Sequence, residues 1–463
     1  MFRYLLKSGV SYTILSFLQP VLGFLLLPFI TQNYSKESYG IYVLLLVFYV
    51  FFTLISGLGL SQAMSNYHFN HISDIQSSKN FLKSVFQYAT AFNIGIFLLG
   101  GGLIITFYSN PLLTNTSIIL AILCGLSEVY SNSSLVYFKN LKKIRIASIC
   151  SFIAIFSNII FSLLVIFQKF DLSFLFLAKF ITNILILILV YFIEKLWQAN
   201  SRFEMIKAGL NYSIKLIPWL IFAWFLYYID RFIIEDKIDF ETLGTFGIII
   251  TISGAIQIFY TGATGAIQPL FMEAFLKKDK KKEVEFLSWF IHIAGIGFLG
   301  LISLIGIIEV VLGDQYLGLG KNIFIASFAF FFTILHYVVT VELIAQKRSQ
   351  LIGIFNSISG IVYLVIIYFD KSLTLSEVII YFLYSKMIGS ILILAIFGIM
   401  KKQVSIVLSI MQNFILYVIL FFAALLLSAY MHYQWAYCIV GVIGIIFIIL
   451  IKAKHVWRFI NAN

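Results

Sequence analysis

The stretch AKFITNILILIL at 178–189 returns later in the chain as SKMIGSILILAI at 385–396, with six identities in twelve positions. Both copies are apolar apart from a few small polar residues and a lysine in the second position, Lys179 and Lys386. Self-similarity at a fixed spacing is the sequence sign of an internal duplication. We therefore expect two related halves, each built from very apolar segments.

Other landmarks recur in the same order, at a spacing that drifts only from about 200 to 207. The stretch SYGIYVLLL at 38–46 is echoed by TLGTFGIII at 242–250, and GLSQAMSN at 59–66 by GATGAIQP at 262–269. Pro20 in the first apolar run has a counterpart in Pro218. The shared order of these landmarks indicates that the halves are collinear.

Composition identifies the environment of these segments. Of 463 residues, 61% are hydrophobic and only 11% are charged, whereas soluble domains carry about 25% charged residues. The mean hydropathy is +1.00. The three cysteines lie inside apolar runs, which excludes a disulfide framework and a CxxC-type zinc site. The chain is predicted to be an all-α integral membrane protein.

A spanning helix needs about 20 apolar residues, and fourteen such runs are found. No soluble domain is left between them. The first run is too long for a signal peptide and has no cleavage site, so we interpret it as a span. The runs cover 8–33, 40–62, 81–108, 112–138, 144–167, 172–193, 205–233, 241–272, 286–312, 322–345, 351–369, 374–400, 404–430 and 434–451.

Positive charges orient these spans. Cytoplasmic loops collect Lys and Arg, and 23 of the 32 basic residues fall in alternate connections that begin with the N-terminus. The alternation predicts fourteen spans with both termini in the cytoplasm. The net charge of +12 is then a property of cytoplasmic loops, including the run KKDKKKE at 277–283, and does not indicate a nucleic-acid partner.

The duplication predicts the architecture. Each half has six spans, so both halves start on the same side of the membrane and form parallel repeats. We expect an N-lobe at 1–200, a C-lobe at 201–402 and an additional helix pair at 403–463. Repeats of this kind place the substrate in the central cavity between the lobes, which is the architecture of a transporter.

Ionisable side chains at membrane depth point to a cavity or to an ion pair, because burying them is costly. We expect Lys215 and Lys386 to line the cavity. Lys179 either lines it or extends to the outer headgroups. Glu128 either carries protons or forms a buried ion pair with one of these lysines. His336, in the tenth run, is a further candidate for ion coupling.

Asp230 and Arg231 are neighbours at the outer end of the seventh run, where they face different directions on a helix. Each either pairs with another helix or contacts the substrate, and Asp230 is also an ion-coupling candidate.

Polar stripes at helical spacing mark two spans. Such stripes either bond to neighbouring helices or line an aqueous cavity, and we favour the cavity because the two spans are adjacent. Gln19 in the first run joins the substrate-binding candidates. The stripes comprise Ser253, Gln257, Thr261, Thr264 and Gln268 in the eighth run, and Asn211, Lys215 and Trp219 in the seventh.

Motifs of other function classes are not found in the sequence. It has no GxxxxGK[ST] for nucleotide phosphates, no HExxH for zinc and no GxSxG elbow. His68 and His71 lie three apart without a third ligand. We expect no cofactor, no metal and no enzymatic activity.

Several stretches, taken in order, resemble the polysaccharide transporter family. They are KSG before Pro20, SYGIY, GLGLSQAMS, KAGLNYSIKLIPW with YYIDRFII, and LGTFGIIITISGAIQIFYTGATGAIQP. These are the Wzx-type flippases of O-antigen and capsule repeat units, in the multidrug, oligosaccharidyl-lipid and polysaccharide exporter superfamily.

The resemblance implies a substrate and a location. The substrate is an undecaprenyl-diphosphate-linked oligosaccharide that is moved from the inner to the outer leaflet of the bacterial cytoplasmic membrane by alternating access, driven by an ion gradient. Its diphosphate would meet the lysines, its sugars the polar stripes, and its tail the membrane lipids. Glycan polymerase machinery is a further expected partner.

Three other functions stay open. A cation or drug antiporter of the same superfamily would need acidic groups in its cavity. A flippase for the peptidoglycan precursor would also have fourteen spans, with a cavity richer in Arg. A membrane glycan polymerase or ligase would need a sizeable outer loop, whereas every outer loop here is short.

Overall fold

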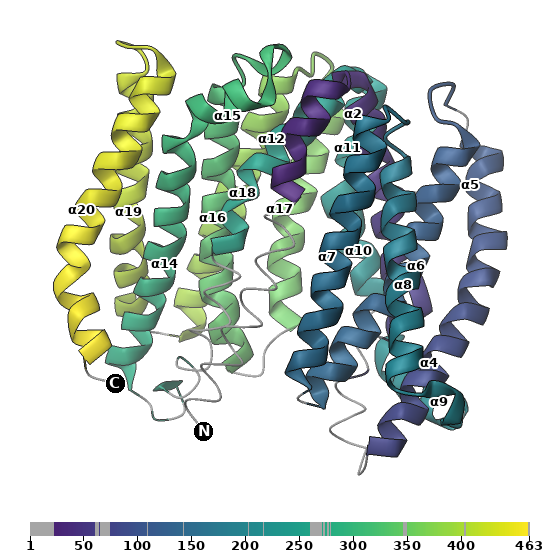
Figure 1. Cartoon of the computed structure of the whole chain (residues 1–463). Helices are drawn as coiled ribbons and strands as arrows, with labels where there is room; N and C mark the ends of the chain where they lie inside the picture. Colours follow the sequence, from purple (N-terminus) through teal and green to yellow (C-terminus); the bar gives the residue numbers. More distant parts are fainter. Residues whose placement is uncertain are drawn as a thin grey trace. The chain divides into compact units, whose positions relative to one another are not determined.

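The computed structural model of the chain consists of helices joined by short connections (Figure 1), and the residues that it describes form no strand. The described residues are 23–60, 64, 75–108, 110–141, 143–201, 203–215, 217–259, 271, 274–275, 277, 279–345, 350–401 and 404–461.

The chain divides into two compact units, Met1–Gly244 and Thr245–Asn463. The helices of the first unit are α2 (Lys36–Ile55), α4 (Ile75–Ile96), α5 (Gly102–Phe107), α6 (Asn115–Asn140), α7 (Ile144–Phe167), α8 (Phe174–Ile193), α9 (Phe203–Ser213), α10 (Ile217–Tyr228) and α11 (Asp230–Lys237). Helix α12 (Phe240–Ser253) continues into the second unit, which contains α14 (Lys280–Ser303), α15 (Ile305–Leu312), α16 (Gly320–Ala345), α17 (Gln350–Phe369), α18 (Leu375–Lys401), α19 (Val404–Leu427) and α20 (Tyr433–Asn461).

Among the described residues, eleven helical stretches are long and apolar enough to cross a membrane. They confirm the prediction of an all-α membrane protein. The number fourteen and the orientation stay predictions. Of the three remaining runs, 8–33 lies mostly outside the described residues, 351–369 coincides with α17, and 205–233 is divided among α9, α10 and α11.

The prediction that 205–233 is one continuous helix is wrong. Helix α9 ends at Ser213, and α10 starts only at Ile217. Pro218 explains the interruption, because proline lacks an N–H and its ring clashes with the carbonyl four residues earlier. Helix α9 packs on α4, and α10 and α11 pack on α2, so these segments lie in the first unit. The lobe boundaries at 200 and 402 stay predictions.

Helix α6 is the centre of the first unit, and α2 and α8 pack directly against it. It is buried along most of its length because many of its residues are small. Gly125 allows the closest approach: a Cβ on this residue would stand 2.5 Å from the carbonyl oxygen of Tyr49 in α2. Small residues at helix interfaces let backbones approach in this way, and side chains of α2, α6 and α8 are thereby brought together.

A break interrupts the second predicted span after Ile55. Gly57, Leu58 and Gly59 adopt left-handed backbone angles, with φ of 58°, 51° and 68°. The break frees backbone groups at a depth where no water is available to satisfy them. Asn93 of α4 meets this need: its Oδ1 accepts from the Gly57 nitrogen at 3.1 Å, and its Nδ2 donates to the Leu126 carbonyl at 2.8 Å.

Ser56 completes this polar cluster. Its hydroxyl donates to the same Leu126 carbonyl at 2.7 Å and accepts from Asn93 Nδ2 at 3.0 Å. Ser56, Gly57, Asn93 and Leu126 are all buried. These bonds tie the break to α4 and α6.

Stacked aromatic rings fill the second unit. Phe324 stacks on Tyr437 with ring centroids 4.1 Å apart, and Phe328 stacks on Phe421 at 3.8 Å. These contacts join α16 to α19 and α20, the neighbouring helices at the yellow end of the chain in Figure 1. Each of the two C-terminal helices thus packs one face against the core of this unit.

Two buried polar groups attach the same helix pair to the unit. The ring nitrogens of His292 in α14 lie 2.9 Å from the Tyr417 hydroxyl and 3.1 Å from Asn413 Oδ1 in α19. Glu309 in α15 accepts from the Tyr433 hydroxyl at 2.8 Å and from Gln434 Nε2 at 2.5 Å. Both contacts use polar atoms that would be costly to bury without a partner.

Candidate functional site

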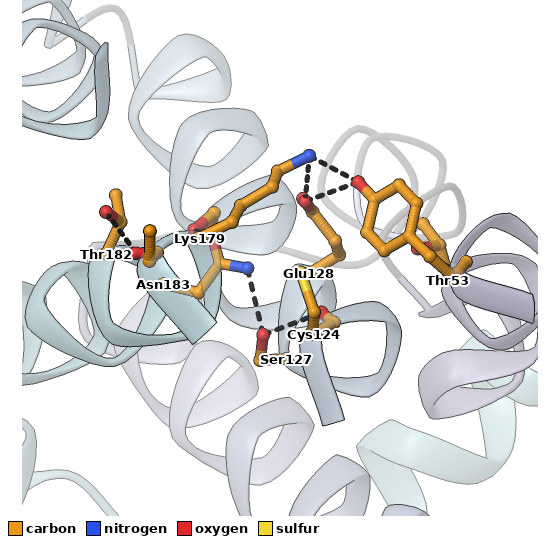
Figure 2. Close-up of polar contacts among 10 residues, drawn as sticks. Thr53, Cys124, Ser127, Glu128, Lys179, Thr182 and Asn183 are labelled. Atoms are coloured by element: carbon orange, nitrogen blue, oxygen red, sulfur yellow. Dashed lines mark hydrogen bonds and ion pairs between the residues drawn. The ribbon is translucent and has the colours of Figure 1, made fainter. Parts of the chain in front are cut away.

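An ion pair lies inside the first unit, where three helices meet (Figure 2). The Lys179 ammonium in α8 lies 2.6 Å from Oε1 of Glu128 in α6. The Tyr49 hydroxyl in α2 donates to the same oxygen at 2.7 Å and also contacts the Lys179 amine. The structure therefore shows the ion-pair alternative for Glu128, and Lys179 turns to this carboxylate.

Because the pair is largely buried, separating its two charges costs free energy. The Glu128 side chain retains 10% of its exposure and that of Lys179 28%. The Lys179 nitrogen also lies 4.5 Å from the centre of the Tyr49 ring, whose face attracts cations. Separating such a pair leaves an uncompensated buried charge, which costs about 3–5 kcal/mol. Lys179 is the more exposed member of the pair.

A row of small polar side chains supports the ion pair. Asn183, one turn after Lys179 on α8, donates to the Ser127 hydroxyl at 2.9 Å and accepts from Ser131 at 2.6 Å. Ser127 in turn donates to the Cys124 carbonyl at 2.7 Å. Figure 2 shows Asn183 and Ser127 beside Glu128, so the contacts between α6 and α8 fix both charged residues.

The second unit holds the equivalent lysine. Lys386 in α18 is buried, and its nitrogen lies 5.1 Å from the centre of the Phe382 ring. One turn later, a Cβ on Gly389 would stand 3.4 Å from Nε2 of His336 in α16. His336 is buried as well. Lys386 and His336 therefore lie on two closely packed helices of one unit.

The predicted polar stripe of the seventh run does not form one helical face. Asn211 lies in α9, Lys215 in the interruption, and Trp219 in α10, so the break before Pro218 removes the i, i+4 register on which the stripe depended. Asn211 and Lys215 are exposed. Their exposure leaves the Lys215 amine accessible on the surface of the first unit.

The eighth-run stripe divides in a similar way. Ser253 is buried and donates to the Ile323 carbonyl at 3.1 Å, which is the helix-bonding alternative. Gln257 follows a turn at Gly254 and Ala255 and is exposed. Gln19, Thr261, Thr264 and Gln268 lie outside the described residues.

Asp230 and Arg231 contact each other, and the prediction that each also meets another helix or the substrate stays a prediction. An Arg231 nitrogen lies 2.5 Å from Asp230 Oδ1, so the neighbours pair with each other. Arg231 also donates to the Tyr227 carbonyl and lies over the Tyr228 ring at 4.7 Å. The reason is local: α11 begins at Asp230, where the carboxylate is beside the turn and the arginine can fold back onto it.

Sequence reasoning missed several of these residues. In the sequence, Tyr49 is one of several aromatic residues in an apolar run, and nothing there distinguishes it from the others. Asn93 and Asn183 are amides at membrane depth, and the rule that such groups bond between helices would have selected them. His292 and Glu309 are ionisable groups inside the ninth predicted run, and the rule used for Glu128 applies to both.

In the part of the chain that the structure describes, no group of three or more His, Cys, Asp or Glu residues could hold a metal ion.

Comparisons with known proteins agree with this architecture. A family model described as "Polysaccharide biosynthesis protein" matches residues 5–275. No curated protein matches the chain. Among solved structures, the lipid II flippase MurJ in an inward closed conformation has 16% identity and a TM-score of 0.66, with 96% of this chain and 100% of that chain covered.

Two further structures have the same fold. An inward-facing multidrug resistance MATE family transporter of the MOP superfamily has 12% identity and a TM-score of 0.62, with coverage of 87% of this chain and 99% of that one. A MOP superfamily transporter from Pyrococcus furiosus has 11% identity and a TM-score of 0.58, with coverage of 86% and 95%. At these identities the likeness is one of fold.

Proposed function

Because the chain belongs to the polysaccharide biosynthesis protein family, we propose that it is a flippase for lipid-linked oligosaccharides. Its substrate is an undecaprenyl-diphosphate-linked repeat unit of O-antigen, capsule or exopolysaccharide. It moves this substrate from the inner to the outer leaflet of the bacterial cytoplasmic membrane, and the two halves alternate in access.

The observation that supports this proposal most is the pair of lysines at membrane depth. Lys179 and Lys386 stand at equivalent places of the repeat, each in a different unit. A diphosphate headgroup cannot enter hydrocarbon unless its charge is compensated, and charge-assisted hydrogen bonds from amines provide that compensation. A cavity for cationic drugs would need the opposite charge. Lys386 favours an anionic cargo, and so would Lys179 whenever Glu128 is protonated and no longer neutralises it.

The Glu128–Lys179 pair gives a route for ion coupling. While Glu128 is ionised, its carboxylate holds the Lys179 amine at 2.6 Å. A proton on Glu128 removes that counter-charge, and the amine then becomes available to a phosphate. Release of the phosphate allows the pair to form again and expels the proton. A charge that crosses the membrane gains about 2.3 kcal/mol per 100 mV. His336 and Asp230 are the other ion-coupling candidates.

Replacing Lys386 by Gln, or Lys215 by Gln, tests the substrate contact. We expect surface glycan to fall about ten- to a hundredfold for each, because a charged hydrogen bond contributes about 1.5–3 kcal/mol. Surface glycan is measured in cells that lack the chromosomal copy, with protein levels compared by immunoblot. Lys371→Gln changes an exposed loop lysine and serves as the matched control. Unchanged glycan at normal protein levels would remove these lysines from the mechanism.

The second candidate function is a flippase for the peptidoglycan precursor. The observation that favours it is the fold shared with MurJ over 96% of this chain. The two candidates differ in cargo. Rescue of cells depleted of their own lipid II flippase would support this second function. Loss of surface glycan on deletion, without a growth defect, would support the first.

A further inference from the structure

A buried carboxylate connects four helices at one end of the first unit. Glu194 directly follows α8 and is only 2% exposed. Its Oε1 lies 2.6 Å from the amine of Lys143, the residue before α7, and its Oε2 lies 3.5 Å from the Lys79 amine in α4. The Tyr137 hydroxyl in α6 donates to Oε2 at 3.0 Å. One carboxylate therefore fixes the positions of two lysines from different helices.

The segment after Glu194 turns back onto α4. Lys195 has a left-handed φ of 51°, which turns the chain at the end of α8, and its side chain is exposed. Leu196 and Ala199 are buried. The Lys83 amine in α4 donates to the Ala199 carbonyl at 2.7 Å. Two further lysines therefore belong to this end of the unit, and together the four form a lysine cluster: Lys79, Lys83, Lys143 and Lys195.

Positive charge exceeds negative charge in the lysine cluster, because four ammonium groups stand against the single carboxylate of Glu194. Helix α9, which packs on α4, contributes one charge of each sign and does not alter the balance. An ammonium has three N–H donors, so contact with Glu194 does not saturate Lys79 or Lys143. Their side chains retain 25% and 30% of their exposure. The cluster is thus complementary to an anion that approaches from the surface.

Aromatic side chains beside the cluster are typical of a membrane surface. The centre of the Trp197 ring lies 6.1 Å from that of Tyr191 and 5.8 Å from that of Phe192, and all three side chains are exposed. Trp and Tyr gather where hydrocarbon meets the headgroups. The predicted orientation puts this end of α8 at the cytoplasmic leaflet, whose anionic lipids attract basic side chains. The cluster therefore lies at the depth of lipid phosphates.

An apolar face of α8 leads from this surface into the membrane. Leu185, Ile188 and Phe192 are exposed and recur at helical spacing, so they lie on one face of the helix. A soluble anion would use the lysines alone. A molecule with a charged head and a hydrocarbon tail would use both the lysine cluster and this face.

We propose that the lysine cluster binds the headgroup of an anionic phospholipid of the cytoplasmic leaflet. The lipid phosphate accepts charge-assisted hydrogen bonds from the Lys143 and Lys195 amines, and an acyl chain lies along α8. Glu194 is a positioning residue, because it holds Lys79 and Lys143 without touching the lipid. This site goes beyond the proposed function and does not rest on it, since the lipid would bind whatever cargo the protein carries.

Lipid affinity of the purified protein tests the site. Native mass spectrometry in detergent measures the binding of added dioleoylphosphatidylglycerol, which is anionic, and of dioleoylphosphatidylcholine, which is neutral overall. The parent should bind the anionic lipid about tenfold more tightly, and Lys195→Gln should weaken this binding about fivefold, because one lysine near an anionic surface contributes a factor of about that size. Equal affinities of the parent for the two lipids would overturn the proposal.

Lys169→Gln is the matched control for Lys195→Gln. Lys169 is also exposed, also follows a helix and also has a left-handed φ, of 53°, but it lies in a predicted outer loop. The variant should bind phosphatidylglycerol as the parent does. Equal losses in the two variants would show a general effect of net charge and contradict a site at the cluster.

A fluorescent label locates the bound lipid. Gln198→Cys places the label beside the lysine cluster, and Gln168→Cys places it after α7 as a control, since both glutamines are exposed. Cys438→Ser is added to both, because the other two cysteines are buried. In phosphatidylcholine vesicles, brominated phosphatidylglycerol should quench the label at 198 about threefold more than brominated phosphatidylcholine does, and the label at 168 equally. Equal quenching at 198 would overturn the site.

The two proposals fail differently, because neither lipid measurement uses glycan export. If deleting the gene leaves surface glycan intact, the proposed function is wrong, while the lipid affinities still test the site. If deletion abolishes glycan and the purified protein binds both lipids equally, only the lipid site is wrong.

Discussion

Lys179→Gln and Glu128→Gln, made one at a time, are each expected to lower the free energy of unfolding by about 3–5 kcal/mol. Each variant leaves one charged group buried among α2, α6 and α8 without its partner. Thermal unfolding in detergent and the amount of folded protein in the membrane are the measurements. Surface glycan should be lost in both variants.

The double variant separates structure from mechanism. With both charges gone, no uncompensated charge is buried, and stability should return to within about 1–2 kcal/mol of the parent. Glycan export should stay low if the pair exchanges a proton for a phosphate. Asp279→Asn removes an exposed pair with Lys282, in which the atoms are 3.7 Å apart, and is expected to change little. Full export by the double variant would show that the pair serves the fold alone.

The second large effect is expected at the break that follows α2. Asn93→Leu keeps the approximate size of the side chain but leaves the Gly57 N–H without its acceptor in apolar surroundings. It also removes the donor to the Leu126 carbonyl. An unsatisfied buried polar group costs about 1–3 kcal/mol, so we expect a loss of about 2–4 kcal/mol in total.

Unfolding temperature and proteolysis of the purified protein would measure this loss. Asn33→Ala is the matched control, because Asn33 also donates to a backbone carbonyl, at 2.8 Å, but on an exposed surface. It should change stability by no more than about 0.5 kcal/mol. If the two variants had equal effects on stability, water or another group must bond to the Gly57 N–H in place of Asn93.

The all-α membrane fold follows from hydropathy alone. Apolar runs of spanning length predict helices, because a backbone in lipid must satisfy its own hydrogen bonds. The interruption before Pro218 could also have been predicted from the sequence, since proline inside a helical run ends or kinks the helix. The left-handed turn at Gly57 to Gly59 could not, because glycine is common in membrane helices and most of its occurrences leave the helix intact.

The site was predictable only in part. Burial cost points to Glu128 and Lys179 as partners or as cavity residues, and the structure decides for a partnership. Periodicity could not find Tyr49, because its hydroxyl becomes relevant only when Gly125 brings α2 against α6. The stripe through Lys215 failed for a related reason: spacing along a sequence describes a face only while the helix is unbroken.

Gly40 in α2 and Gly244 in α12 stand at matching places of the internal duplication. In an isologous interface, residue i of one copy contacts residue j of the other while j contacts i. Gly40 against Phe240 and Gly244 against Lys36 have that reciprocal form. Such reciprocity is the pattern that two copies of one helix produce when they cross at equivalent residues. Neither position tolerates a side chain larger than hydrogen, because a Cβ at Gly40 or at Gly244 would collide with the backbone of the facing helix.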